Sequence, residues 1–296
     1  MLNEDGMVYD DGVTTRLDEN HYIMTTTTGG AANVLGKLED YLQTEWPELD
    51  VYLTSVTDHF ATTSICGPNC KKILNKLIPE LDLSDENFPH MSYKEARIEK
   101  IKCRIMRISF TGEHTYEINV QANYGSSLWE KCMNAGKEFN ITPYGTETMH
   151  LLRAEKGFII VGQDTDGTMT PIDLQMDWIV SKKKYDFIGK RSLYRSDTIR
   201  EDRKQLVGLV TDNPKEVLEE GAQIVSKLNQ NPVKMLGHVT SSYYSPNLNK
   251  SIAFAVVRGG KDMMGKKLFV PMEGRSINVT VTNPVFFDKG NKRLNA

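Results

Sequence analysis

The first apolar pattern along the chain predicts a helix. Four apolar side chains recur three or four residues apart, which places them on one helix face: Leu35, Leu38, Leu42 and Trp46. Pro47 cannot continue a helix, so we expect the helix to end before it. The threonine-rich run just upstream, at residues 25–28, is expected to be a strand.

Short runs rich in β-branched and aromatic residues predict strands farther along. Residues 51–57 and 61–65 have this composition. A glycine and a proline, Gly67 and Pro68, follow the second run and predict the start of another helix.

Residues 106–120 predict a hairpin, with Gly112 at its turn. On the first strand Met106, Ile108 and Phe110 share one face, because side chains alternate along a strand. On the returning strand, apolar side chains at positions 116, 118 and 120 lie opposite Glu117 and Asn119. One face of this hairpin is therefore expected to be apolar and the other polar.

Two further helices are expected after the hairpin. The first covers residues 126–135 and has Gly136 as its C-cap. The second covers residues 146–157 and begins with a threonine cap. Strands mixed with helices in this order predict an α+β domain.

The last third of the chain changes character. Residues 196–203 are charged and lack apolar periodicity, which is typical of a linker. Six short strands separated by turn residues then predict a small β-barrel. They are residues 206–210, 223–226, 235–240, 252–257, 267–270 and 277–281.

Charge and hydropathy exclude some classes of partner. The 296 residues carry a formal net charge of −3, and basic residues are scattered except for Lys182–Lys184, which we interpret as a solvated loop. Binding to nucleic acid is therefore not expected. No apolar run is long enough to span a membrane, and residues 1–7 are too polar for a signal peptide.

The four cysteines do not form a metal-binding pattern. Cys66 and Cys70 have C-x3-C spacing, but no second pair or histidine cluster accompanies them. Cys103 and Cys132 lie in apolar segments that we expect in the core. We expect no metal site and a reducing, cytoplasmic setting.

Candidate chemistry begins with two adjacent carboxylates, Asp10 and Asp11, placed after a glycine turn on an expected short strand. Because side chains alternate along a strand, only one of the two can enter a pocket, where it could act on a ligand amine. The alternative is that the Asp-Asp-Gly sequence is a solvated turn.

Four segments together resemble the aminomethyltransferase family, the tetrahydrofolate-dependent T-proteins of glycine cleavage. They are DDGVTTR at 10–16, TTTTGGA at 25–31, YLQTEWP at 41–47 and GQDTDGTMTP at 162–171. Within that family the chain resembles in particular the C-terminal folate-binding domain of the heterotetrameric sarcosine oxidase alpha subunit. The resemblance covers essentially the whole chain.

The resemblance implies a fold and a domain division. It implies a T-protein-like folate-binding domain at residues 1–195, a linker at 196–204 and a C-terminal β-barrel at 205–296. In relatives the segment similar to residues 1–7 is internal to the folate domain. We therefore expect a chain that begins within a domain, through a gene fragment, a split gene or a mis-assigned start.

The resemblance also implies four site residues. Asp10 matches the catalytic carboxylate, which orients the attacking folate amine and takes its proton. Glu117 matches the carboxylate that accepts two hydrogen bonds from the pterin, although it could be an exposed strand glutamate. Phe110 stands where many T-proteins have tyrosine and could stack on the ring. Arg153, in the sequence RAEKG, could pair with folate or with Glu117, or lie on the helix surface beside Glu147.

The expected activity is transfer of the sarcosine methyl carbon to tetrahydrofolate, giving 5,10-methylenetetrahydrofolate. No G-x-G-x-x-G motif is present, so flavin and NAD are expected only on partner domains or on other sarcosine oxidase subunits. One alternative is a stand-alone aminomethyltransferase of the glycine cleavage type. Another is a non-catalytic folate-binding or scaffold module, because a fold does not establish an activity.

Overall fold

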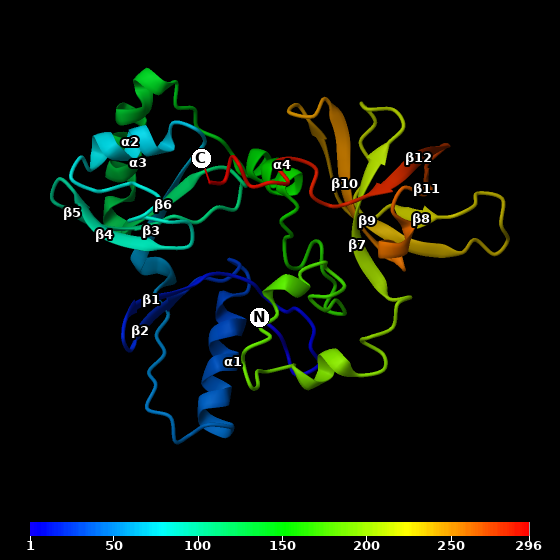
Figure 1. The fold of residues 1–296 in the computed structure, drawn as a ribbon, viewed down its shortest axis with the longest axis horizontal. Coiled ribbons are helices and arrows are strands. Elements are labelled where there is room, and N and C mark those ends of the chain that lie inside the picture. Colours follow the sequence, from blue (N-terminus) through cyan, green and yellow to red (C-terminus); the bar gives the residue numbers. More distant parts are fainter. Residues whose placement is uncertain (296) are drawn as a thin grey trace. The chain divides into compact units, whose positions relative to one another are not determined.

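The computed structural model describes residues 1–295 and divides into two compact units (Figure 1). The sheet unit contains Gly12–Met149 and the end of the chain from Gly290, and the barrel unit contains Met1–Asp11 and His150–Lys289. None of the helices within residues 1–295 combines the length and the apolarity that crossing a membrane requires.

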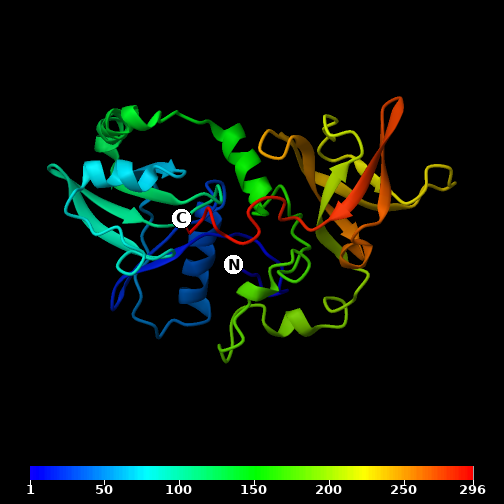
Figure 2. The same cartoon turned by 45° about the horizontal axis from the view of Figure 1, so that its top comes forward.

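A four-stranded antiparallel sheet forms the core of the sheet unit, with strand order β3-β6-β5-β4. The strands are β3 (Phe60–Cys66), β4 (Tyr93–Ile98), β5 (Ile101–Met106) and β6 (Thr115–Gln121). In both Figure 1 and Figure 2, α2 (Cys70–Leu77) and α3 (Gly125–Gly136) lie on the same side of this sheet. Apolar side chains of both helices and of all four strands form one buried cluster there.

The remaining elements of the sheet unit precede the sheet in the chain. A hairpin of β1 (Thr14–Asp18) and β2 (His21–Met24) leads to α1 (Ala31–Thr44). Helix α1 ends before Pro47, as predicted. Only Val34 of this helix is fully buried.

The barrel unit holds a closed six-stranded barrel with strand order β10-β7-β12-β11-β8-β9. All six predicted strands are present: β7 (Lys204–Thr211), β8 (Gln223–Val225), β9 (Met235–Ser245), β10 (Lys250–Arg258), β11 (Lys267–Met272) and β12 (Arg275–Thr282). Helix α4 (Thr146–Lys156) begins in the sheet unit and continues into this one. The predicted combination of an α+β domain and a C-terminal barrel is confirmed.

Strands β7 and β10 are buried on both faces. Val207 and Val257 point into the barrel and join its core. Leu206 and Phe254 point outward and pack with Met169 in a second cluster. Because both faces are covered, these strands have nearly continuous apolar sequences.

Short 3₁₀ helices connect several of these elements. They are Thr57–His59, Ala122–Tyr124, Lys137–Phe139, Asp177–Ile179, Arg191–Tyr194 and Gly260–Met263.

Several predicted boundaries are wrong. Residues 51–56 form no strand, and the Tyr52 side chain is 90% exposed, because no neighbouring strand pairs with this run. The first strand of the predicted hairpin ends at Met106, so Phe110 lies in a loop. Strand β2 ends at Met24, before the threonine run.

The predicted C-cap of α3 is also wrong. Gly136 keeps a right-handed helical backbone, and the chain continues into the 3₁₀ helix Lys137–Phe139. The left-handed residue that ends this segment is Asn140, with φ of 56°. Asparagine tolerates that conformation better than most residues, so it replaces glycine as the cap.

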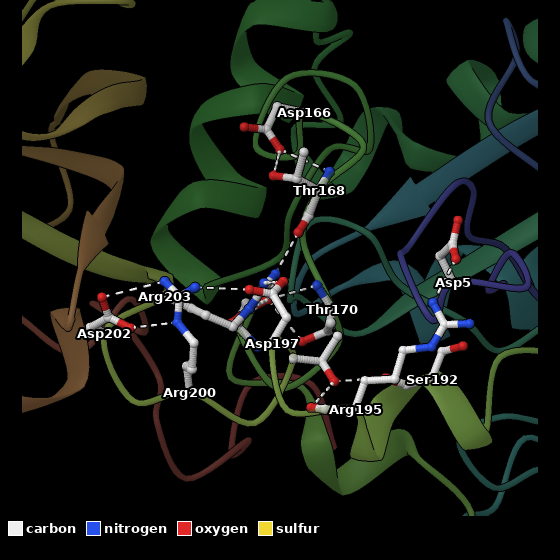
Figure 3. Close-up of polar contacts among 12 residues, drawn as sticks. Asp5, Asp166, Thr168, Thr170, Ser192, Arg195, Asp197, Arg200, Asp202 and Arg203 are labelled. Atoms are coloured by element: carbon white, nitrogen blue, oxygen red, sulfur yellow. Dashed lines mark hydrogen bonds and ion pairs between the residues drawn. The ribbon is translucent and has the colours of Figure 1, made fainter.

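The predicted linker is an ordered segment. Arg203 pairs with Asp173 and Asp197, and Arg200 pairs with Asp197 and Asp202 (Figure 3). The division into units places the chain on both sides of this segment in the barrel unit. The domain boundary at 196–204 therefore stays a prediction.

Candidate functional site

Asp10 is a buried carboxylate at the end of the N-terminal segment of the barrel unit. The expected strand is reduced to one bridge between Leu2 and Val8, and Asp10 follows it in irregular structure. The Asp10 side chain is 2% exposed, and its Oδ1 accepts a hydrogen bond of 2.7 Å from the Asp11 amide. Of the two adjacent carboxylates, Asp10 is the one enclosed by the protein.

Asp11 is half-buried beside it. Burial, together with the negative charge of Asp10, raises the pKa of Asp11 above its usual value. The pair therefore has one enclosed carboxylate and one that protonates more readily than a solvated aspartate.

Glu117 lies in the middle of β6, on the sheet face opposite the apolar cluster. Its strand neighbours are Ser64 on β3 and Met106 on β5. Within residues 1–295 the Glu117 carboxylate makes no hydrogen bond or ion pair with a protein group. Burial raises its pKa above the usual 4.5. A half-buried carboxylate without a partner is suited to accept hydrogen bonds from a ligand.

The sequence analysis missed a second polar group next to Glu117. Burial is the main cause that raises the pKa of Tyr144 to about 12, and the nearby Cys66 and Glu117 add to this rise. Tyr144 lies in an irregular segment with no recognisable pattern, so no sequence signal pointed to it.

Phe110 lies in the loop that joins β5 to β6, in the same unit as Glu117, and its ring is half-buried. The loop is held by the Ser109 hydroxyl, which accepts a hydrogen bond of 3.0 Å from the Gly112 amide. Its far end is fixed by an ion pair of 2.8 Å between Glu113 and Arg293. These contacts give Phe110 a defined position although it is not in a strand.

Arg153 is the residue whose surroundings differ most from the prediction. Its side chain is 0% exposed, so the alternative of a helix-surface position beside Glu147 is wrong. Its guanidinium pairs with Asp164 and donates to the Phe158 carbonyl and the Ser241 hydroxyl. Within its own unit, Arg153 therefore joins α4 to strand β9 of the barrel. Contact of this side chain with folate stays a prediction.

The four predicted residues thus fall into two groups. Asp10 and Arg153 belong to the barrel unit, and Phe110 and Glu117 belong to the sheet unit. Two surface cavities of about 440 and 500 Å³ occur in the sheet unit, and neither is lined by Phe110 or Glu117. The Glu117 carboxylate, which has no protein partner among residues 1–295, marks the candidate site of this unit.

Comparison with known proteins gives two family matches. Residues 1–184 match the model of the GCVT N-terminal domain, and residues 204–288 match the glycine cleavage T-protein C-terminal barrel domain. The second match covers the six-stranded barrel.

Similar curated proteins carry two names. The chain is 50% identical to the sarcosine oxidase subunit alpha of Corynebacterium sp. (strain P-1) and 43% identical to that of Rhizobium meliloti (strain 1021), over 99% of its length in each case. It spans only 31% and 30% of those proteins. It is 29% identical to an aminomethyltransferase of Clostridium botulinum (strain Okra / Type B1), over 99% of this chain and 76% of that protein.

Among solved structures, the fold is similar to that of the glycine cleavage system aminomethyltransferase T from Bartonella henselae. The TM-score is 0.82, and the match covers 98% of this chain and 75% of that one. Sequence identity is 23%, so the match is evidence for the fold alone.

Proposed function

Because this chain belongs to the glycine cleavage T-protein family, we propose that it binds tetrahydrofolate and transfers a one-carbon unit to it. More specifically, it is the folate-binding part of a sarcosine oxidase alpha subunit. It captures the methyl carbon of sarcosine as 5,10-methylenetetrahydrofolate. Flavin and NAD chemistry belongs to partner domains or subunits, and the high identity to the two alpha subunits supports this choice.

The half-buried Glu117 carboxylate is the observation that supports folate binding. A pterin presents an amino group and an adjacent ring N–H on one edge, and a carboxylate can accept both hydrogen bonds at once. Glu117 has no competing protein partner within residues 1–295, so it is available for this edge. The two hydrogen bonds from the pterin would replace the hydrogen bonds to water that the carboxylate loses on burial.

Asp10 is the proposed catalytic residue. Its carboxylate orients the folate amine that attacks the one-carbon unit and accepts the proton that this amine releases. The same negative charge stabilises the positive charge that develops next to the transferred carbon. Burial at 2% exposure strengthens both effects, because little water screens the charge.

Arg153 has a supporting role in this proposal. Its guanidinium is committed to Asp164 and the barrel, so we assign the folate contacts to Glu117 and Phe110 and the stabilisation of the barrel unit to Arg153. Phe110 would cover one face of the pterin ring through stacking.

Calorimetric titration with tetrahydrofolate tests the binding half of the proposal without any partner. The wild-type chain should bind saturably, and Glu117→Ala should weaken binding at least tenfold through loss of the bidentate pair. Glu80→Ala is a matched control, because Glu80 is an exposed glutamate of the same unit. Equal affinity of the wild type and Glu117→Ala would refute the proposed site.

Asp10→Asn tests the catalytic half. The amide has nearly the same shape but cannot accept a proton, so the folate dissociation constant should stay within about threefold while the turnover rate falls by roughly 10²–10⁴-fold. Turnover is measured as 5,10-methylenetetrahydrofolate formed from sarcosine with the partner subunits and tetrahydrofolate present. An unchanged rate would remove Asp10 from the mechanism.

A stand-alone aminomethyltransferase is the second candidate, because the chain spans 76% of an aminomethyltransferase but only 31% of a sarcosine oxidase alpha subunit. Release of ammonia from an aminomethyl-lipoyl carrier protein would favour this activity. Formation of 5,10-methylenetetrahydrofolate from sarcosine with partner subunits would favour the first. Folate binding without turnover in either assay would identify a non-catalytic folate-binding module.

A further inference from the structure

The segment from Gly162 to Asp173, which we call the 162–173 loop, is held at both ends by buried ion pairs. Between them it contacts the segment that leads to Asp10. We propose that this loop positions the Asp10 carboxylate, and that Asp164, Asp173 and Arg203 are positioning residues of the reaction. The proposal rests on the catalytic role given to Asp10 above.

Asp164 fixes the first end of the loop. Its side chain is 0% exposed and pairs with Arg153. It also accepts hydrogen bonds from Thr240 at 2.6 Å and Ser241 at 2.7 Å, both on barrel strand β9. A further bond of 2.9 Å comes from the Ile160 amide. Both carboxylate oxygens are thus bonded, and this end of the loop is attached to the barrel.

Asp173 fixes the second end. Arg203 donates to it through Nε at 3.1 Å and through Nη2 at 2.8 Å. The same Nη2 reaches the Thr168 carbonyl at 2.7 Å, inside the loop (Figure 3). The amide and hydroxyl of Thr170 also donate to Asp173, each at 2.9 Å. One guanidinium therefore holds both the end of the loop and its middle.

The loop contacts the Asp10 segment through Met169. The Met169 carbonyl accepts a hydrogen bond of 2.8 Å from the Val8 amide, and the two side chains pack in the same buried cluster. Val8 is two residues from Asp10, and no strand pairing continues beyond the bridge at Val8. The Met169 carbonyl therefore fixes the chain two residues before Asp10.

A second contact to this segment is more exposed. Arg195 pairs with Asp5 at 2.8 Å with both side chains more than half exposed (Figure 3). The Ser192 hydroxyl donates to the Glu4 carbonyl at 2.6 Å. Exposed ion pairs contribute little because water and salt screen them. We therefore assign the positioning to the buried pairs of the 162–173 loop.

Amide hydrogen exchange of the full chain, followed in peptides that cover residues 6–12, tests the proposal directly. Arg203→Ala should speed exchange in these peptides at least tenfold. Arg203→Lys keeps the positive charge but lacks the planar guanidinium with its several N–H donors, so it should give an intermediate exchange rate. It replaces the alanine variant in the test if that variant does not fold. Arg200→Ala is the matched control, because Arg200 lies three residues away with a side chain 50% exposed. It should leave exchange unchanged.

The same variants separate positioning from general destabilisation. Arg203→Ala should lower turnover roughly 10- to 100-fold, the effect expected of a misplaced catalytic group, with the tetrahydrofolate dissociation constant within threefold of wild type. Exchange at 6–12 equal to that of Arg200→Ala, or equal losses of folate affinity and turnover, would overturn the proposal. If Asp10→Asn leaves turnover unchanged, the catalytic role proposed for Asp10 fails, while the exchange rates still decide whether the loop holds Asp10.

Discussion

Glu117 is in an environment that is unfavourable for the isolated fold. Its carboxylate is half-buried and has no donor among residues 1–295, so the charged form loses hydration without gaining a partner. Ligand-binding groups are often kept in such a state, because the missing partner is supplied by the ligand. The site is therefore expected to reduce the stability of the free protein.

The raised pKa of Glu117 gives a pH-dependent prediction. Burial disfavours the charged carboxylate but not the protonated carboxyl. The folded protein therefore has its full stability with respect to this group below the usual pKa of 4.5, and it loses this stability as the pH rises through the raised pKa. Glu117→Gln cannot ionise. The melting temperature of Glu117→Gln should therefore match that of wild type near pH 4 and exceed it increasingly toward pH 8.

Thermal unfolding at pH 4, 6 and 8 measures this difference. Glu80→Gln is the control, because Glu80 is exposed and its charge remains hydrated. A difference between Glu117→Gln and wild type that does not vary with pH would show that ionisation of Glu117 has no part in it.

At the residue scale, the sequence predicted the direction in which a side chain points better than it predicted the groups that this side chain contacts. The alternation along residues 116–120 correctly separated Glu117 from its apolar neighbours. The surroundings of Arg153 could not be predicted, because its partners are 11 and 88 residues away, at Asp164 and Ser241. No local pattern encodes such distant pairing.

At the element scale, strands were predictable where turns separate them and where both faces are covered. The six barrel strands meet these conditions. Residues 51–57 have a strand-like composition but no neighbouring strand, and composition alone does not provide hydrogen-bond partners. Strand β9 extends five residues past its predicted end at 240. The added residues include serines, which are typical of loops but are buried here. Ser241, for example, donates a hydrogen bond to Asp164.

Two helical glycines give a matched pair of predictions at this scale. A Cβ added at Gly136, in α3, would lie 2.6 Å from the Cβ of Ile141. Gly136→Ala should be destabilising, because overpacking costs about 1–3 kcal/mol while the gain in helix propensity is only about 0.5–1 kcal/mol. A Cβ at Gly36, in α1, would meet no atom within 4 Å. Gly36→Ala should therefore stabilise by about 0.5–1 kcal/mol.

Urea unfolding of the two variants and of wild type gives both free energies of unfolding. Gly136→Ala at or above wild-type stability would mean that Ile141 moves away without cost. Destabilisation by Gly36→Ala would mean that this position of α1 has a role that its open surroundings do not suggest.

At the scale of the whole molecule, charged side chains help to attach the barrel to the chain that precedes it. Three residues at the end of α4 are charged and buried. Arg153 bonds to strand β9, Glu155 accepts a hydrogen bond of 2.6 Å from Ser245, and Lys156 pairs with Asp288 at 3.1 Å. Buried charges of this kind tolerate few alternative arrangements, since each needs its own partner. The barrel should therefore unfold together with α4.

The Arg153–Asp164 pair tests how strongly this attachment depends on charge. Arg153→Met leaves the Asp164 charge buried without its cation, so it should cost about 3–5 kcal/mol of unfolding free energy. The double variant Arg153→Met/Asp164→Asn removes both charges and should cost less than the sum of the single changes, with a coupling of about 0.5–3 kcal/mol. Arg195→Ala, which breaks an exposed pair, should cost about 1 kcal/mol or less. Urea unfolding of wild type, Arg153→Met, Asp164→Asn and the double variant gives the cycle, and additive single effects would show that the two charges stabilise the barrel unit independently.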